Sequence, residues 1–243
     1  MPLLSFRDVT VRYGATVALS GINLDVEPGE RIAFVGGSGS GKTTLLSVVS
    51  GYRKPTHGTI SRSPGMRTGL LLQDPVASLD PSWSLEKIVG EPLRDSQRKL
   101  TPEARRAAVL QALNAVRLGG LSLDRRPDEL SVGQCQRIAL ARALVAQPAL
   151  LLADEPTSAL DPSVAAGILR LMDDALTTTG AALLVVSHDV LAVAPLVHRM
   201  IVLDQGRIVE QGPPQQLLDH PVHPATAQLA ETAHRLAVTP ITD

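Results

Sequence analysis

The sequence predicts an α/β protein with a parallel core sheet, an antiparallel sheet at its N-terminus and an inserted helical region. Two uninterrupted apolar runs, 149–153 and 181–186, are typical of buried parallel strands, and a helical pattern at 162–178 lies between them. Apolar residues alternate with polar ones over the first thirty residues, as in the strands of an antiparallel sheet. From about 74 to 130 the pattern changes to helices and loops. Strand–helix alternation around two buried strands favours a parallel α/β core.

The N-terminal segment predicts two paired strands. Leu4 and Phe6, and then Val9 and Val11, lie on one face of the first strand, and 19–26 forms the second. The turn residues 27–30 lead into a third, apolar strand at 31–35. Tyr13 ends the first strand pair, and aromatic residues make up only 2% of the chain.

Residues 36–43 have the form G-x-x-x-x-G-K-[ST], the phosphate-binding loop. A strand precedes this loop and a helical stretch, 44–50, follows it, whereas a Gly/Ser-rich linker would lack both. Glycines let backbone N–H groups surround phosphate oxygens, and the helix directs its positive end to the same place. Lys42 would reach the β- and γ-phosphates, and the Thr43 hydroxyl would bind Mg²⁺. The predicted ATP contacts in this stretch are Gly36, Gly37, Ser38, Gly39, Ser40, Gly41, Lys42, Thr43 and Thr44.

The remaining elements follow from local signals. Short strands at 58–60 and 69–72 flank a Pro-Gly turn and are expected to form a hairpin. Thr101 with Pro102 starts a helix, and Ser131 caps another, at 134–146. A hairpin is predicted at 200–203 and 207–210, and helical segments finish the chain.

Four polar residues follow predicted core strands. Asp154 could hold Mg²⁺ together with Thr43, and Glu155 could accept a proton from an attacking water. The Gln73 amide could contact Mg²⁺ and the same water, and His188 could donate to the γ-phosphate. Each residue alone also fits an ordinary strand-end turn, but ligands bind at the carboxyl ends of strands in such sheets.

Composition limits the classes of protein to which this chain can belong. The net charge of −1 gives no nucleic-acid footprint. The single cysteine, Cys135, excludes an internal disulfide and favours a reducing compartment. Neither a signal peptide nor a membrane-spanning stretch is expected, so the protein would be soluble or held at a membrane by a partner.

Taken together, the phosphate loop, Gln73 and the segments 130–134, 154–155, 158–161 and 187–189 resemble the nucleotide-binding subunit of an ATP-binding cassette transporter. The resemblance implies a P-loop NTPase (RecA-like) core with an N-terminal antiparallel β subdomain and an inserted α-helical subdomain. It also implies two ATP molecules, with Mg²⁺, between the protomers of a head-to-tail dimer. It assigns Tyr13 to adenine stacking. The segment that contacts the partner's nucleotide would comprise Ser131, Gly133 and Gln134, and Asp161 is also implied as an ATP contact.

Within that family, 73–75, 78–81 and 220–224 resemble the oligopeptide, dipeptide and nickel uptake group. That group implies two membrane-spanning permease subunits, a second ATP-binding subunit that is another protein or a second copy, and, indirectly, a solute-binding protein. The protein would then lie on the cytoplasmic face of the membrane. We expect one nucleotide-binding domain, in which 1–76 and 148–212 form the core and antiparallel sheet, 77–147 the helical subdomain and 213–243 a helical tail.

The chain departs from the group at a few positions. Val132 replaces the first glycine of L-S-G-G-Q, and Ala225 and Ala227 stand where Tyr and Arg are common. A soluble cassette ATPase that serves an enzyme complex, for example in phosphonate breakdown, is the alternative. A small-molecule kinase would have no reason to carry the Ser131–Gln134 segment or His188. The cargo is selected by other proteins, so this sequence does not reveal it.

Overall fold

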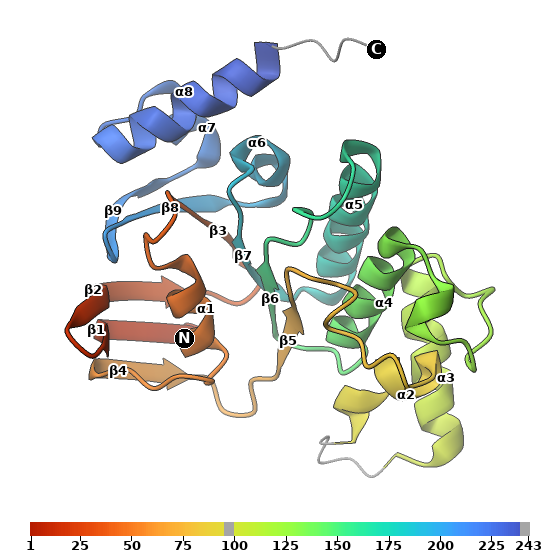
Figure 1. Cartoon of the computed structure of the whole chain (residues 1–243). Coiled ribbons are helices and arrows are strands. Elements are labelled where there is room, and N and C mark those ends of the chain that lie inside the picture. The colour runs from red at the N-terminus through yellow and green to blue at the C-terminus, as the bar shows by residue number, and fades with distance from the viewer. Residues whose placement is uncertain (95–99, 239–243) are drawn as a thin grey trace. The chain divides into compact units, whose positions relative to one another are not determined.

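The computed structural model describes residues 1–94 and 100–238 (Figure 1). These residues form two compact units: the first unit comprises Met1–Pro64 and Leu183–Asp243, and the second comprises Gly65–Ala182. Residues 95–99 of the predicted helical subdomain and 239–243 of the predicted tail lie outside the described residues. The predicted subdomain boundaries divide the chain differently and stay a prediction.

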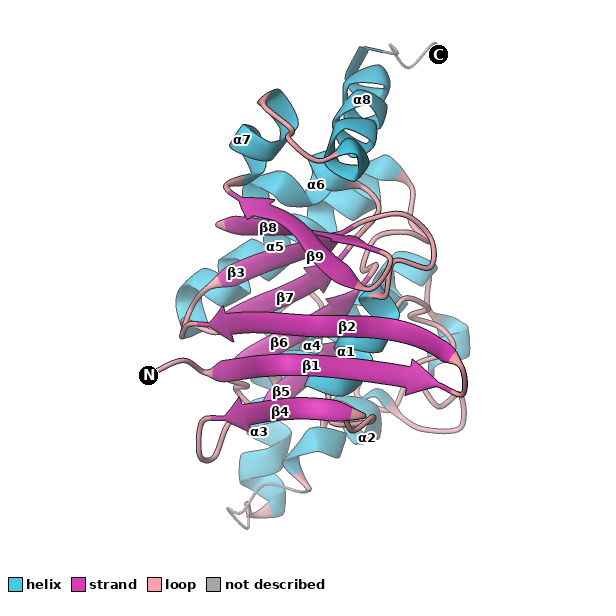
Figure 2. Cartoon of the chain, turned by 90° about the vertical axis from the view of Figure 1, so that its left-hand side faces the viewer, coloured by secondary structure: helices cyan, strands magenta, loops and turns pink. Residues whose placement is uncertain are grey.

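The first unit contains the predicted antiparallel sheet, in the order β2-β1-β4 (Figure 2). Its strands are β1 (Leu4–Tyr13), β2 (Thr16–Val26) and β4 (His57–Arg62). The pairing of β1 with β2 is irregular between Phe6 and Val9, and Asp8 there has a φ of 51°. Because this extra residue resets the alternation, Phe6 and Val9 are both fully buried.

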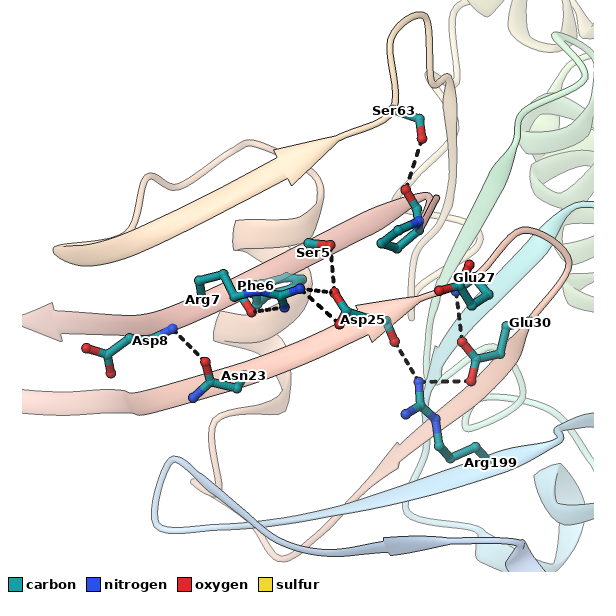
Figure 3. A network of polar contacts seen from close by, with 11 residues as sticks. Ser5, Phe6, Arg7, Asp8, Asn23, Asp25, Glu27, Glu30, Ser63 and Arg199 are labelled. Atoms are coloured by element: carbon teal, nitrogen blue, oxygen red, sulfur yellow. Dashed lines mark hydrogen bonds and ion pairs between the residues drawn. The ribbon is translucent and has the colours of Figure 1, made fainter.

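A polar network fastens this sheet to the strands beside it (Figure 3). The Asp25 carboxylate of β2 accepts a hydrogen bond of 2.6 Å from Ser5 and forms an ion pair of 2.8 Å with Arg7. The Ser5 hydroxyl, followed by Arg7, lowers the pKa of Asp25. Arg199 donates to the Asp25 carbonyl at 2.7 Å and pairs with Glu30 at 2.8 Å, which links β2 to β8.

The core sheet of the first unit positions the phosphate loop. β3 (Arg31–Val35) pairs in parallel with β7 (Ala182–Val186) on one side and with β8 (Arg199–Asp204) on the other, and β9 (Arg207–Gly212) is antiparallel to β8. The helices of this unit are α1 (Lys42–Val49), α6 (Val190–Val193), η3 (Ala194–Leu196), α7 (Pro214–Asp219) and α8 (Pro224–Val238). The strands β3 and β7 form the apolar centre of this sheet, since Ile32, Phe34 and Leu184 are fully buried.

The second unit joins a strand pair to helices. β5 (Thr68–Leu71) and β6 (Leu150–Asp154) are parallel. The helices are α2 (Leu85–Val89), η1 (Glu91–Leu93), α3 (Pro102–Ala115), η2 (Pro127–Glu129), α4 (Val132–Leu144) and α5 (Pro162–Thr179). The predicted caps Thr101 and Ser131 are confirmed, because each accepts a hydrogen bond from the first turn of its helix, and Asp161 caps α5 in the same way.

The predicted hairpin between 58–60 and 69–72 is wrong. β4 pairs antiparallel with β1, and β5 pairs in parallel with β6. β4 carries mostly exposed residues, which suits an edge strand, whereas Gly69 and Leu71 of β5 are buried. Across 1–94 and 100–238, every helix is too short or too polar to cross a lipid bilayer.

Candidate active site

The phosphate loop lies between β3 and α1 and is held by its neighbours in the first unit. Gly36 has a φ of 152°, and a Cβ atom there would lie 2.2 Å from the carbonyl oxygen of Leu203. Only glycine tolerates this approach to β8. The Gly206 N–H donates to the carbonyl of Ser40 at 3.0 Å, and Ser40 is buried. Close packing against β8 and the turn after it therefore stabilises the loop conformation.

Lys42 closes the loop upon itself. Its ammonium group donates to the carbonyls of Gly36 at 2.7 Å and Gly37 at 2.8 Å, and reaches the Ser40 hydroxyl at 3.3 Å. The helix α1 begins at Lys42 with Gly41 as its N-cap and no capping side chain. Backbone N–H groups, the helix dipole and an ammonium group together form a cradle for an anion such as phosphate.

His188 lies at the same sheet edge as the phosphate loop. Phe34 of β3 pairs with Val186 of β7, and the Ser187 N–H donates to the Phe34 carbonyl at 3.3 Å. Because the two strands are parallel, the loop and His188 both follow their carboxyl ends. His188 is exposed, and Asp189 caps the helix α6 behind it. The predicted proximity of His188 to the loop is consistent with this register.

Tyr13 ends β1, opposite Thr16 of β2. Its side chain is 46% exposed. The guanidinium carbon of Arg53 lies 3.7 Å from the centre of the Tyr13 ring, a contact that sequence reasoning missed. The ring is thus held on one side and accessible to solvent on another.

The second unit brings Gln73 and Glu155 together. Leu71 of β5 is in register with Ala153 of β6, so both polar residues follow parallel strand ends. The Gln73 amide donates to the Glu155 carboxylate at 3.3 Å. Glu155 has a φ of 44°, a strained conformation for a non-glycine residue, and its carbonyl accepts from the Ser158 hydroxyl at 3.1 Å. Asp154, half-buried, precedes it at the strand end.

The segment Ser131–Gln134 starts α4 with reciprocal hydrogen bonds. The Ser131 hydroxyl accepts from the Gln134 N–H at 3.3 Å, and the Gln134 side chain accepts from the Ser131 N–H at 2.9 Å. Val132 is 45% exposed in the first turn. Gly133 lies close to α5, since a Cβ atom there would be 2.9 Å from Val164. This arrangement presents an uncharged, partly apolar helix start.

Gln136, one turn into α4, joins this segment to the turn after β6 that carries Glu155. Its buried amide donates to the carbonyl of Pro156. Sequence reasoning missed this contact, because the burial that requires a partner for the Gln136 amide is apparent only in the structure.

Asp161 caps α5. Its carboxylate accepts from the Ser163 hydroxyl at 2.7 Å, the Ser163 N–H at 3.2 Å and the Val164 N–H at 3.1 Å. The Ser163 hydroxyl, followed by the Val164 N–H, lowers the pKa of Asp161. Asp161 therefore has a local structural role beside the one implied by resemblance.

The chain has a glycine loop after a parallel strand, a lysine that binds within that loop, and carboxylates at the end of a buried strand. These features define a phosphate-loop ATPase. A family model described as "ABC transporter" matches residues 19–158, and the chain belongs to that family. The expected fold class is therefore confirmed, and the chain is an ATP-binding ATPase subunit.

Curated relatives are named as transport ATP-binding proteins. The chain is 38% identical over 242 residues to "Probable D,D-dipeptide transport ATP-binding protein DdpF" of Escherichia coli, an alignment that covers 95% of this chain and 78% of the relative. It is 34% identical over 226 residues to "Oligopeptide transport ATP-binding protein OppF" of Salmonella typhimurium, with 87% and 68% covered.

Solved structures show the same fold. The structure of cbiO1 from Clostridium perfringens, described as part of the ABC transporter complex cbiONQ, matches with a TM-score of 0.81 and 28% identity. That match covers 98% of this chain and 99% of the other. A dimeric post-hydrolysis structure of the ATP-binding cassette MJ0796 with ADP and Pi matches with a TM-score of 0.76 and 28% identity, and covers 87% and 98%.

Proposed function

We propose that this chain is the ATP-hydrolysing motor subunit of a peptide importer. The observation that carries the hydrolytic role is the contact between Gln73 and Glu155 at adjacent parallel strand ends, 3.3 Å apart. A carboxylate with an amide beside it can bind and orient a water molecule, which is one of the protein's contributions to nucleotide hydrolysis. Transport is supported by the names of the curated relatives.

The predicted loop residues bind the triphosphate in this proposal, and the predicted catalytic residues act on the attacking water and the γ-phosphate. The triphosphate binds to the loop residues 36–44, and Lys42 exchanges the Gly36 and Gly37 carbonyls for β- and γ-phosphate oxygens. Glu155 accepts the proton of the attacking water, while Gln73 orients that water and His188 donates to the γ-phosphate. The strained backbone of Glu155 fits a functional position, where such conformations concentrate.

The chemistry of the predicted metal ligands fits Mg²⁺. Thr43 offers a hydroxyl oxygen, Gln73 an amide oxygen and Asp154 a carboxylate, and Mg²⁺ prefers oxygen ligands. When bound, Mg²⁺ neutralises the charge that develops on the phosphates.

We further propose a head-to-tail dimer. MJ0796, which shares this fold, is dimeric in two solved structures. In such a dimer Ser131, Gly133 and Gln134 of one protomer face the nucleotide of the other, and Asp161 lies at the shared interface. The neutral start of α4, with Ser131 as its cap, suits an approaching γ-phosphate. The second protomer is a different ATP-binding subunit or a second copy.

A cavity of about 260 Å³ in the second unit supports a membrane partner. Leu70, Leu72, Glu91 and Arg142 are among its lining residues. Leu70 and Leu72 are 36% and 40% exposed, and Val76 nearby in the chain is 48% exposed. We propose that a short helix from a permease subunit binds here, which would hold the chain at the cytoplasmic face of the membrane. A solute-binding protein would act indirectly, through the permease pair.

The proposed cargo class is peptides. The relatives above are named for D,D-dipeptide and oligopeptide transport, whereas nickel rests on the motif resemblance alone. The relatives' names favour transport over a soluble role in an enzyme complex.

Purification from the native membrane tests the proposal. We expect a tagged chain to bring down two polytopic membrane proteins and a second ATP-binding subunit. The variant Leu70→Asp/Leu72→Asp should lose the membrane proteins but keep ATP binding. Leu110→Asp is the matched control, since Leu110 of α3 is 37% exposed and does not line the cavity. Recovery of soluble enzymes in place of membrane proteins would overturn the transport role.

A further inference from the structure

The end of β1 carries an arginine–tyrosine stack that no motif predicts. The Arg53 guanidinium covers the Tyr13 ring at 3.7 Å from its centre, and its Nη2 donates to the carbonyl of Arg12 at 2.9 Å. The Arg53 N–H in turn donates to the carbonyl of Ser47 in α1 at 2.9 Å. Arg53 is therefore fixed at both its backbone and its side chain.

The segment that follows Arg53 and the phosphate loop contact different neighbours of β1. In the sheet β2-β1-β4, residues after Arg53 run along the β4 side of β1: the Arg12 N–H donates to the Thr56 hydroxyl at 3.0 Å, and the Thr56 N–H donates to the Thr10 carbonyl at 2.8 Å. The phosphate loop lies on the β2 side, since a Cβ atom on Gly41 would be 2.7 Å from the carbonyl of Ala18. The Tyr13 ring, in contact with the Arg53 guanidinium, is still 46% exposed and so keeps accessible surface for a base.

We propose that Arg53 is a positioning residue for nucleobase binding, which fixes Tyr13 so that its uncovered face receives adenine. This inference rests on the proposed adenine contact of Tyr13. A ring already held at one orientation loses less conformational entropy when a base stacks on it. The cation on one face also draws π-electron density away from the other, which favours stacking with an electron-rich purine.

The predicted effect depends on the base and not on the phosphates. Arg53→Met should weaken ATP binding about fivefold, the change expected from about 1 kcal/mol of cation–π and orientation energy. Binding of inorganic tripolyphosphate, which has no base, should not change. Arg53→Lys keeps a cation over the ring and should recover part of the loss. Lys54→Met is the matched control, since Lys54 is the adjacent, exposed cation.

The experiment measures the dissociation constants of the full chain for ATP and tripolyphosphate by calorimetry, without Mg²⁺ so that ATP is not hydrolysed. Tyr13→Ala should weaken ATP about tenfold or more, as loss of base stacking does. In that background Arg53→Met should have no further effect, because the two residues act through one contact.

The outcomes distinguish the adenine contact of Tyr13 from the positioning role of Arg53. If Tyr13→Ala leaves the ratio of the two dissociation constants unchanged, the adenine site itself is wrong. If Tyr13→Ala changes that ratio and Arg53→Met does not, the role of Arg53 is overturned. Tighter ATP binding by Arg53→Met would also overturn it, because the guanidinium would then occupy the face that the base needs. Equal losses for ATP and tripolyphosphate would show a general structural effect and contradict the proposal.

Discussion

A methyl group at Gly36 should disrupt the phosphate loop through a clash with β8. The added Cβ atom would lie 2.2 Å from the Leu203 carbonyl oxygen and 2.7 Å from the Ser40 hydroxyl. Ordinary contacts begin about 1 Å further out, and neither partner can move away easily, because the Leu203 carbonyl is backbone of β8 and Ser40 is buried in the loop. The φ of 152° adds a conformational cost of about 1–3 kcal/mol for a residue with a side chain.

Gly39 is the matched control, because a Cβ atom there would meet nothing within 4 Å although its φ is 75°. Gly39→Ala should therefore cost only the left-handed backbone term, about 1–2 kcal/mol. For Gly36→Ala the clash adds to a backbone cost of similar size, and we expect a total loss of about 3 kcal/mol or more.

Urea unfolding and ATP calorimetry on both variants measure these losses. If the loop opens to relieve the clash, part of the cost should appear as weaker ATP binding, by about 100-fold for 2.7 kcal/mol. Equal losses of stability in the two variants would refute the reasoning, because close packing against β8 would then have no consequence.

Three further predictions follow from single contacts. Lys42→Ala should weaken ATP and tripolyphosphate alike, by about 1.5–3 kcal/mol as for hydrogen bonds to charged groups, and a fluorescent ATP analogue would show no loss if Lys42 does not bind phosphate. Val132→Gly should raise ATP turnover of the dimer without changing ATP affinity of the monomer; unchanged turnover would mean that the exposed valine does not hinder the partner's nucleotide. Asp161 has a lowered folded-state pKa, so its stabilising contribution is complete above its ordinary, unfolded pKa and is lost as pH falls through the folded value. The Tm difference between wild type and Asp161→Ala should therefore be larger at pH 6 than at pH 3, and a difference that grows on acidification would contradict this sign.

Local signals predicted most elements because their causes are local. The caps Thr101, Ser131 and Asp161 were predictable, since each hydrogen bond is made within three residues. The phase change between Phe6 and Val9 marked the irregularity at Asp8, although the bulge itself was not anticipated. Strand ends with polar residues correctly placed Gln73 beside Glu155.

Partners distant in sequence were not predictable from periodicity. The choice of β1 for β4 and of β6 for β5 depends on register across the sheets, whereas a Pro-Gly turn signals only a change of direction. The contacts of Arg53 with Tyr13 and of Gln136 with Pro156 also join residues whose spacing has no helical or strand period. Short α2 lacks the length for a periodic signal.

Phosphate release by Glu155→Gln, measured beside ATP binding by the same variant, tests the hydrolytic site most directly. The substitution keeps the shape and the hydrogen-bonding reach of the side chain but removes the base. We predict ATP affinity close to wild type and almost no phosphate release. Phosphate release at the wild-type rate would contradict the assignment of Glu155 as the residue that activates water.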